Sequence, residues 1–241
     1  MGKTVHFPVI RLSRPDHLVL LMLNDRDGFM TEIDREEFDL ALLEAGFTIA
    51  AEKGWPRFTL VEAAQRAGLP IDEVRARFPF RHSLLFRLGR LADESAFRDD
   101  GLSGSIRERI FDLFMRRFDV FQQYREGIRA VLQALPTEPG LTLLLGAATL
   151  DTMRWMAEVA GVECSGLGGV MRLNGLAGVW GFALRAWEKD ESADLSQTMA
   201  ALDQGLDKAE RFGVLKPSPD RLMDQASQRS GIADHPLELE T

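Results

Sequence analysis

Basic side chains gather in one segment of an otherwise acidic chain. The 241 residues carry a formal charge of −8 at pH 7, whereas the segment 53–90 has five more basic than acidic residues. Positive groups concentrated in this way can neutralise phosphates, so the segment could bind a nucleic acid; a solvated charged face is the simpler alternative. The basic residues are Lys53, Arg57, Arg66, Arg75, Arg77, Arg81, Arg87 and Arg90, and the acids are Glu62, Asp72 and Glu73.

A capped helix leads into this segment. Asp34 and Glu37 have the three-residue spacing of a capping box, so we expect a helix to begin at Asp34. Lys53 suits the last turn of this helix through the helix dipole, and Gly54 suits its end through a left-handed backbone. The apolar residues of the helix recur with helical spacing at Phe38, Leu42, Ala45 and Ile49.

Two short helices follow. Thr59 can cap a helix over 60–67, which Gly68 would close. Pro70 suits the start of the next helix, over 71–77, because a first-turn N–H has no partner to lose. Two short helices joined by a glycine-containing turn have the spacing of a helix-turn-helix, whose second helix can lie in the major groove of DNA.

Residues 34–90 resemble the DNA-binding region of the tetracycline-repressor (TetR) family of bacterial transcription regulators. The resemblance runs through AAEKGW, FTLVEAAQRAGLP and VRARFPFRHSLL and is specific over about fifty residues. The matching positions are Trp55, Thr59, Ala63, Ala64, Ala67, Gly68, Phe78, Pro79, Leu84 and Leu85. The resemblance implies an all-α fold and a cytoplasmic, one-component repressor that binds operator DNA as a homodimer and responds to a small apolar effector.

We accordingly expect four parts in the chain. They are an N-terminal arm over 1–33, a helix-turn-helix DNA-binding domain over 34–80, a helical effector-binding and dimerisation domain over 81–213, and a disordered tail over 214–241. The polar, proline-bearing composition of the last part is typical of segments that cannot bury enough apolar surface to fold.

The resemblance also implies which side chains would meet double-stranded DNA. Phosphate contacts are expected from Thr59, Arg75, Arg77 and Arg81, and base-edge contacts from Ile71, Asp72, Glu73 and Ala76. The helix over 71–77 departs from the family, which usually has small or polar residues at the start of this helix and a tyrosine in its middle. Its two acids favour the helix dipole but repel phosphate, so this recognition helix is atypical.

An apolar effector site is expected in the helical domain. Phenylalanine recurs with helical spacing in the helix that starts near Ser105, and methionine and tryptophan occur in the helix over 141–160. Such residues often form plain core, but the resemblance implies that these helices surround the effector cavity. The expected lining is Phe111, Phe114, Met115, Phe118, Met153, Trp155 and Met156, with Arg154 or Gln122 as a polar contact.

Glycines within a helix indicate close packing near the C-terminus. A helix over 170–188, after a loop over 162–169, contains Gly175, Gly178 and Gly181. Each glycine costs about 1 kcal/mol relative to alanine in a helix interior, so a packing partner is needed to explain them. That partner could belong to the same chain or to a second copy.

The last two helices resemble the pair that forms the dimer interface of the TetR family. Asp194 and Gln197 have the spacing of a capping box for the last helix, over 195–212. The resemblance implies that this helix and the glycine-bearing one meet their copies in the homodimer. The expected interface residues are Gly175, Gly178, Gly181, Leu195, Met199, Leu202 and Leu206.

No catalytic or metal-binding pattern accompanies these elements. Cys164 is the only cysteine, which excludes an intrachain disulfide, and the four histidines are scattered. The sequence contains no HExxH, phosphate loop or GxSxG, so we expect neither an enzyme nor a metal or other cofactor. Its apolar runs are short or carry charges such as Asp151 and Arg154, so we expect no membrane span.

A lipid-binding protein is the alternative function. Ubiquinone-biosynthesis accessory proteins share the TetR fold but bind lipid or isoprenoid instead of DNA, and ESADLSQTMAALDQGLDKAERFG is faintly similar to their C-terminal part. The tail after Gly213 lacks the strong apolar face of their lipid-binding helix, which favours the regulator.

Glu73 provides a test of base reading by the atypical helix. An acid at a base edge can accept a hydrogen bond from cytosine N4, so Glu73→Ala should relax specificity at one base pair by about 1–3 kcal/mol. Binding of the variant to a panel of single-substituted duplexes would measure this change. Tighter binding of the variant to every duplex would instead show that Glu73 only repels the DNA backbone.

Overall fold

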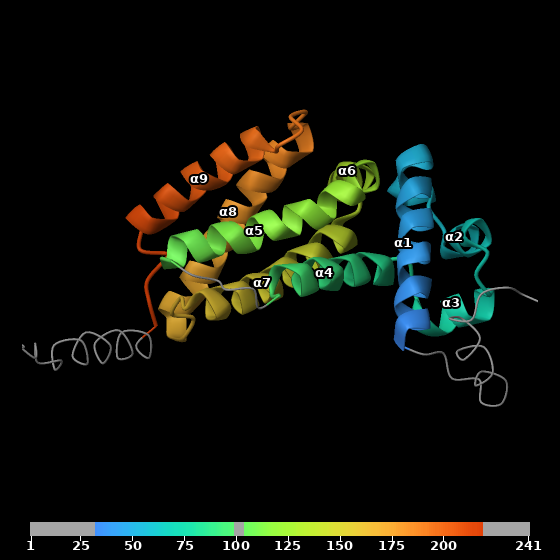
Figure 1. The fold of residues 1–241 in the computed structure, drawn as a ribbon, viewed down its shortest axis with the longest axis horizontal. Helices are drawn as coiled ribbons and strands as arrows, with labels where there is room; N and C mark the ends of the chain where they lie inside the picture. Colours follow the sequence, from blue (N-terminus) through green and yellow to red (C-terminus); the bar gives the residue numbers. More distant parts are fainter. Residues whose placement is uncertain (1–31, 99–103, 219–241) are drawn as a thin grey trace, which may run out of the picture. The chain divides into compact units, whose positions relative to one another are not determined.

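The structure, a computed structural model, describes residues 32–98 and 104–218. Within these ranges the chain forms nine α-helices, two short 3₁₀ helices and no β-strand (Figure 1). The all-α prediction is therefore confirmed. Nearly all of the predicted arm and most of the predicted tail lie outside the described residues.

The helices follow one another with short connections. The α-helices are α1 Glu32–Lys53, α2 Leu60–Ala67, α3 Ile71–Arg77, α4 Ser83–Ala96, α5 Ile106–Gln123, α6 Arg125–Ala134, α7 Pro139–Ala160, α8 Gly166–Lys189 and α9 Ser196–Arg211. The 3₁₀ helices are η1 Trp55–Arg57 and η2 Leu135–Thr137. Helix α5 lies along α4, and α8 packs against α9 (Figure 1).

Contacts divide the chain into two units, residues 1–38 and residues 39–241. Of the first unit, the structure describes only 32–38, the first turns of α1. Helix α1 begins at Glu32, so the predicted cap Asp34 lies within the first turn instead. Acidic residues suit the first turn of a helix as well as its cap, so the sequence pattern does not separate the two. All contacts described below lie in the second unit.

Helices α2 and α3 have the predicted bounds. Thr59 Oγ1 accepts a hydrogen bond from the N–H of Glu62 at 3.3 Å, which caps α2. Gly68 ends α2 in the left-handed conformation, with φ of 67°. Ala64 of α2 and Val74 of α3 are buried, and this small apolar contact holds the two helices together.

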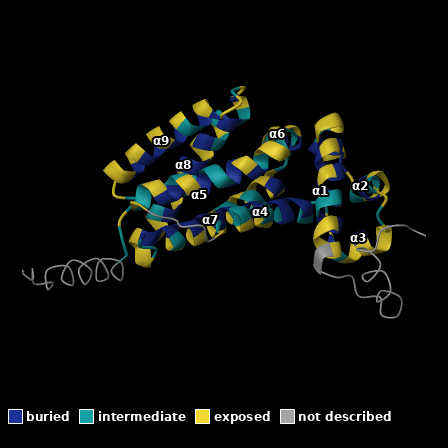
Figure 2. Cartoon of the chain, in the orientation of Figure 1, coloured by how far each residue is buried: buried dark blue, intermediate teal, exposed yellow. Residues whose placement is uncertain are grey.

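An aromatic core joins α5 to α8. Ser105 and Glu108 form a capping box that begins α5. The Phe118 ring stacks on Trp180 of α8 with centroids 4.6 Å apart, and Phe114 meets the same ring edge-on at 5.3 Å. Both phenylalanines are fully buried, and dark blue marks the buried residues along α5 in Figure 2. Aromatic pairs in these geometries stabilise a core beyond the burial of their surface.

Helix α8 begins at Gly166, four residues before the predicted start, so the predicted loop is shorter. Gly166 has a φ of 63°, which allows the chain to turn sharply into the helix. At Gly169, an added Cβ would lie 2.0 Å from the carbonyl oxygen of Cys164, so only glycine fits there. These glycines resemble loop residues in the sequence because their packing partner is visible only in the fold.

Residues 214–218 return along the loop between α7 and α8. Val162 and Pro217 form an isolated antiparallel bridge, and the N–H of Glu163 donates to the carbonyl of Lys216 at 2.9 Å. Val214 packs against α8 beside Gly175, where an added Cβ would lie 2.8 Å from its side chain. This part of the predicted tail is thus attached to the helical body.

Asp190 fixes the turn between α8 and α9. Its fully buried carboxylate accepts hydrogen bonds from the N–H of Thr198 at 2.8 Å, from the hydroxyl of Thr198 at 2.7 Å, and from the N–H and hydroxyl of Ser192. Burial alone would raise the pKa of Asp190, but these hydrogen bonds outweigh it and lower the pKa to about 2. The predicted Asp194–Gln197 capping box is wrong, because Asp190 bonds the first-turn amide of α9 from outside the helix.

Substitution of Asp190 should therefore destabilise the fold. Asp190→Asn should lower the free energy of unfolding by about 2–4 kcal/mol, since it removes charge-assisted bonds in a buried turn. Urea denaturation would measure this loss. Asp194→Asn is the matched control, since Asp194 makes one exposed contact, to the Ser196 amide at 3.2 Å, and its loss should cost about 1 kcal/mol or less.

The same group predicts an acid-dependent loss of stability. The pKa of Asp190 is about 2 in the fold and 3.8 in its ordinary state, so the folded chain favours the charged form. Its contribution is present above pH 4 and declines as the pH falls from about 4 to about 2. Unfolding free energies across this window should decline more steeply for the unsubstituted protein than for Asp190→Asn; equal slopes would contradict the assignment.

Candidate nucleic-acid interface and ligand cavity

The outer face of α3 carries the residues predicted to read bases. Ile71, Asp72, Glu73 and Ala76 are all exposed, whereas Val74 points into the core between α2 and α3. Arg75 is also exposed and donates to the carbonyl of Pro79 just after the helix. The face therefore offers two carboxylates, one guanidinium and one large apolar side chain to a partner.

An apolar hollow of about 470 Å³ lies beside this face, between α2 and α3. Val61 and Ile71 are the exposed apolar residues of its wall, 50% and 48% exposed. The other residues that line it are Phe58, Thr59, Leu60, Val74, Arg75, Phe78 and Arg81. Thr59 is both a predicted phosphate contact and the cap of α2, so its hydroxyl already has one partner in the fold.

Most basic side chains of this region are paired with carboxylates. Lys53 bonds Glu62, and Arg66 forms a two-point ion pair with Glu52 at 2.7 and 2.8 Å. The hydrogen bond from Arg66 lowers the pKa of Glu52, which is exposed. The positive excess visible in the sequence is thus reduced at the surface.

The buried carboxylate of Asp39 binds two arginines, Arg77 and Arg87. Its carboxylate accepts from Arg77 Nε at 3.1 Å and Nη2 at 2.6 Å, and from Arg87 Nε at 2.8 Å. Asp39 and Arg87 are 8% and 7% exposed. We call these three residues the Asp39 cluster; it joins α1, α3 and α4. Arg77, predicted to contact phosphate, is held here at the end of α3.

Arg81 makes a second connection, at the start of α4. Its Nη2 donates to Glu138 at 2.5 Å, and its Nη1 donates to the carbonyl of Pro56 at 3.2 Å. The guanidinium lies over the buried Trp55 ring, 5.7 Å from its centroid. Beside it, burial and then the charge of Arg81 lower the pKa of His82. Arg81 therefore links η1 and α4 to the residue before α7.

Helix α6 packs directly on α1. An added Cβ at Gly127 would lie 2.5 Å from the carbonyl oxygen of Phe47, so the two backbones approach as closely as glycine permits. Tyr124 and Phe47 add a ring contact with centroids 5.5 Å apart. A displacement of α6 would therefore act on α1 without intervening side chains.

A cavity of about 590 Å³ lies among α4, α5, α6, α7 and α8, and we call it the α4–α8 cavity. Its wall is mainly apolar and includes Leu85, Phe86, Leu88, Gly89, Phe121, Ile128, Val131, Leu132, Leu135, Leu145, Gly146, Ala148, Ala177, Trp180, Gly181 and Leu184. Its polar members are Arg90, Asp93, Arg117, Thr142, Thr149, Asp151 and Thr152. A mainly apolar wall with a few polar groups is typical of a site for a small molecule.

None of the seven residues predicted to line a cavity belongs to this wall. Phe114, Phe118, Met153 and Met156 are buried in the core instead, Phe111 and Met115 are half-buried, and Trp155 is 58% exposed. On α5 the cavity side carries Arg117 and Phe121, which lie next to the face that holds Phe114 and Phe118. Helical spacing identified the apolar face of α5, but that face packs against α8.

Arg117 and Asp93 are the cavity residues that sequence reasoning missed. Arg117 donates through Nη1 to Asp93, and its guanidinium lies over Phe121 and Trp180, 5.5 and 5.3 Å from their centroids. Burial raises the pKa of Asp93, although Arg117 opposes this, and burial lowers the pKa of Arg117. Arg117 and Asp93 lie in different helices, 24 residues apart, so no local pattern in the sequence pairs them.

The residues predicted for a dimer interface divide into two groups. Leu202 and Leu206 are fully buried within the chain, where α9 packs on α8, and Leu195 is 5% exposed. Gly175 faces Val214 of the same chain. Gly178 and Gly181 are exposed, and an added Cβ at either would meet nothing within 4 Å. Met199 is half-buried.

The exposed side of α8 is apolar. Leu167, Met171 and Phe182 are 81%, 71% and 46% exposed. With Gly178 they follow helical spacing, so they form one stripe along α8. We call these four residues the α8 stripe. Exposed Asn174 interrupts the stripe between Met171 and Gly178. Large exposed apolar side chains gathered on one face of a helix mark an interaction site more often than a solvated face.

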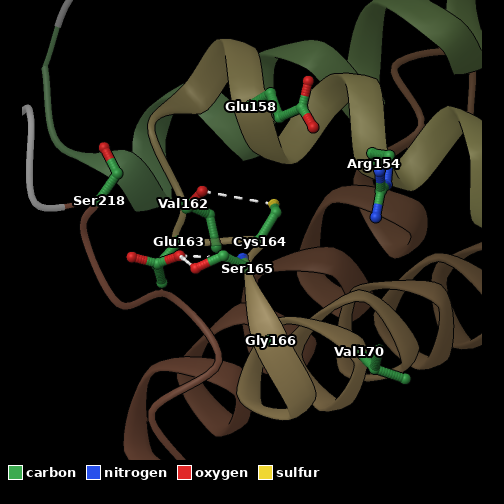
Figure 3. Close-up of a pocket in the computed structure, with 9 residues that line it drawn as sticks. All are labelled: Arg154, Glu158, Val162, Glu163, Cys164, Ser165, Gly166, Val170 and Ser218. Atoms are coloured by element: carbon green, nitrogen blue, oxygen red, sulfur yellow. Dashed lines mark hydrogen bonds between the residues drawn. The ribbon is translucent and has the colours of Figure 1, made fainter.

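A polar hollow surrounds Cys164 between α7 and α8 (Figure 3). The thiol donates to the carbonyl of Val162 at 3.4 Å, and burial followed by the charge of Glu158 raises its pKa. Ser165 is held by Glu163. A raised pKa makes the thiol less nucleophilic at neutral pH.

The part of the chain that the structure describes contains neither a cluster of metal-ligating side chains nor a helix able to cross a bilayer. In residues 32–98 and 104–218, no three metal-ligating side chains come together to form a metal site. None of the helices in these ranges has the length and apolarity that crossing a bilayer requires.

Comparison with known proteins relates the fold to solved structures. No protein-family profile and no curated protein matches the chain. A TetR transcriptional regulator from Nitrosomonas europaea ATCC 19718 superimposes with a TM-score of 0.59 at 21% identity, over 72% of this chain and 98% of that chain. A TetR-family regulator from a Rhodococcus species gives a TM-score of 0.49 at 17% identity, over 71% and 98% of the two chains. The first likeness confirms the predicted TetR-like fold.

The Asp39 cluster should be essential to the fold of this region. Asp39→Asn leaves the buried Arg87 with only a long contact to the exposed Glu94, at 3.5 Å, so the free energy of unfolding should fall by about 3–5 kcal/mol. Chemical denaturation would measure the loss. Glu36→Gln removes an exposed carboxylate from the same helix and should change stability by no more than about 0.5 kcal/mol. Similar small effects from both variants would show that Arg87 finds another partner.

Proposed function

We propose that the protein is a TetR-like, one-component transcriptional regulator that binds operator DNA as a dimer and responds to a small, largely apolar ligand. The observation that carries this proposal is the position of α4. Arg87 of α4 belongs to the Asp39 cluster, and the next two residues, Leu88 and Gly89, line the α4–α8 cavity. One helix therefore contacts both the ligand-sized cavity and the element that carries the recognition helix.

The cavity can act on the helix-turn-helix through this helix. A ligand that wedges α4 away from α7 would displace Arg87, and with it Asp39 and Arg77 at the end of α3. The contact of Gly127 with Phe47 gives α6, another wall of the cavity, a second route to α1. A ligand shifts such an equilibrium only by the difference between its affinities for the two arrangements.

In this proposal the exposed face of α3 reads the DNA. Ile71, Asp72, Glu73 and Ala76 meet base edges, while Arg75 and Thr59 contact phosphates. Arg77 and Arg81 are bound to Asp39 and Glu138, so their main role is to hold α3 and α4 in place. Few phosphate contacts imply a shallow dependence of affinity on salt concentration.

DNA binding can be tested by selecting duplexes from a random pool and measuring the salt dependence of their affinity. Arg75→Ala should reduce the slope of log K against log salt by about 1, because one phosphate contact is lost. Arg98→Ala, an exposed arginine beyond the end of α4, should leave the slope unchanged. If no duplex is retained even at low salt, the regulator is refuted and the lipid-binding alternative is preferred.

We further propose that the dimer forms through the α8 stripe of two copies. Leu167, Met171 and Phe182 supply apolar surface, and Gly178 supplies the close approach that an exposed glycine permits. Lys208 of α9 lies beside this surface, with its Nζ 5.4 Å from the centroid of the Phe182 ring, as expected for the polar rim of an interface.

A bulky residue at Gly178 should separate the subunits. The Cβ of Gly178→Leu meets nothing within the chain, so the variant should fold normally yet lose the close contact between copies. Sedimentation at micromolar concentration should show a dimer for the unsubstituted protein and a monomer for the variant. Gly140→Leu, at an exposed glycine at the start of α7, should remain dimeric. A monomeric unsubstituted protein would exclude this interface.

A further inference from the structure

The chemistry of the α4–α8 cavity narrows the class of ligand, an inference that rests on the ligand-binding role proposed above. Its wall contains one deeply buried cation, Arg117, whose side chain is 7% exposed. Burying a guanidinium in apolar surroundings costs several kcal/mol unless its charge and its N–H groups are compensated. The hydrogen bonds and opposite charge that the protein supplies to Arg117 therefore determine which groups a ligand must supply.

That compensation is incomplete. Arg117 Nη1 donates to Asp93, but the buried Nε–H has no hydrogen-bond partner. A guanidinium presents five N–H groups and can bind a carboxylate through two of them at once. Burial also raises the pKa of Asp93, the carboxyl that accepts this bond, although Arg117 opposes the shift. Arg117 therefore has a buried N–H donor without a hydrogen-bond acceptor.

The surroundings of the guanidinium leave its edge for bonding. The rings of Phe121 and Trp180 lie 5.5 and 5.3 Å from the guanidinium carbon and interact with its face. A planar cation held against aromatic rings binds acceptors in its own plane. A planar, two-oxygen acceptor suits this geometry better than a single hydroxyl does.

The other charged groups of the cavity do not change the charge expected of the ligand. Arg90 and Asp151 are exposed, one cation and one anion, and Thr142, Thr149 and Thr152 are neutral. A buried N–H without a partner is stabilised by a hydrogen-bond acceptor. A cationic ligand would bring donors and would leave this N–H of Arg117 without an acceptor. The rest of the wall is apolar and suits a hydrocarbon body.

We propose that the α4–α8 cavity binds an amphiphilic carboxylic acid, with its carboxylate on Arg117 and its hydrocarbon part among α4, α6 and α7. On binding, the carboxylate takes over the guanidinium edge, and Asp93 loses part of its hold on Arg117. Asp93 belongs to α4, so ligand binding weakens a link between α4 and α5. Acid binding and movement of α4 are then the same event.

Three probes of equal chain length test the proposal on the full chain. Decanoate and decylamine below their micellar concentrations, and 1-decanol below its solubility limit, would be titrated by calorimetry or by the fluorescence of Trp180 and its neighbours. Decanoate should bind at least about tenfold more tightly than 1-decanol, as a charge-assisted bond to a buried group implies. Decylamine should bind most weakly.

Two variants locate the preference. Arg117→Met keeps the volume but removes the cation, so decanoate should lose about tenfold in affinity while 1-decanol changes little. Arg116→Met is the matched control, because Arg116 lies next along α5, outside the cavity wall, and bonds the carbonyls of Ala96 and Arg98. It should keep the full preference for the acid.

Asp93→Asn keeps the test valid if Arg117→Met does not fold. It removes the competing carboxylate, so decanoate should bind more tightly than to the unsubstituted protein. Equal affinity for decanoate and 1-decanol, tighter binding of decylamine, or a weaker decanoate affinity in Asp93→Asn would overturn the inference. Binding of 1-decanol without any acid preference would leave the ligand-binding part of the proposed function intact, whereas no binding of any probe would refute both.

Discussion

The carboxylate of Asp39 is the interaction on which the arrangement of the helix-turn-helix depends. It is almost completely buried and accepts hydrogen bonds from the guanidinium groups of Arg77 and Arg87. Two cations and one anion enclosed in this way tolerate little displacement, since a broken bond leaves a buried charge without a partner. The end of α3, the middle of α1 and the first turns of α4 therefore move together or not at all.

Helix α4 takes part in two sets of contacts, the Asp39 cluster and the wall of the α4–α8 cavity. Arg87 belongs to the Asp39 cluster, while Leu88, Gly89 and Asp93 contribute to the wall of the α4–α8 cavity. Asp93 in turn bonds Arg117 of α5. The helix is thus held by an ion pair on each side, one toward the recognition helix and one inside the cavity. In the proposed mechanism, a ligand that competes for the second pair changes the forces on the first.

The carboxylates around α3 explain why the number of arginines in the segment 53–90 overstates how strongly this region can bind phosphate. Arg66, Arg77 and Arg81 each have a carboxylate partner at 2.8 Å or less. An exposed ion pair stabilises the protein little, but its two opposite charges largely cancel, so the arginine attracts a distant phosphate less. With Asp72 and Glu73 at the start of α3, selectivity at base edges becomes a larger part of the proposed recognition than attraction to the backbone.

Local chemistry made the helix-turn-helix predictable from sequence. Thr59, Gly68 and Pro70 act on backbone groups a few residues away, so the bounds of α2 and α3 follow from the order of the residues alone. The TetR-like fold was recognisable for the same reason, since its family pattern consists of these caps and turns. The start of α8 was not, because Gly169 is required by the carbonyl of Cys164 above it.

The site itself was decided by tertiary structure. Periodicity showed that α5 and α7 have apolar faces, but a closed core and a cavity need the same apolar side chains, and only the packing of α8 on α5 separates them. Asp39 and Arg87 are 48 residues apart, and Arg117 and Asp93 are 24 apart, distances over which composition carries no pairing information. The sequence alone determined where the helices begin and end by local hydrogen bonding; which faces of them meet was determined by the burial of charge and volume across the whole fold.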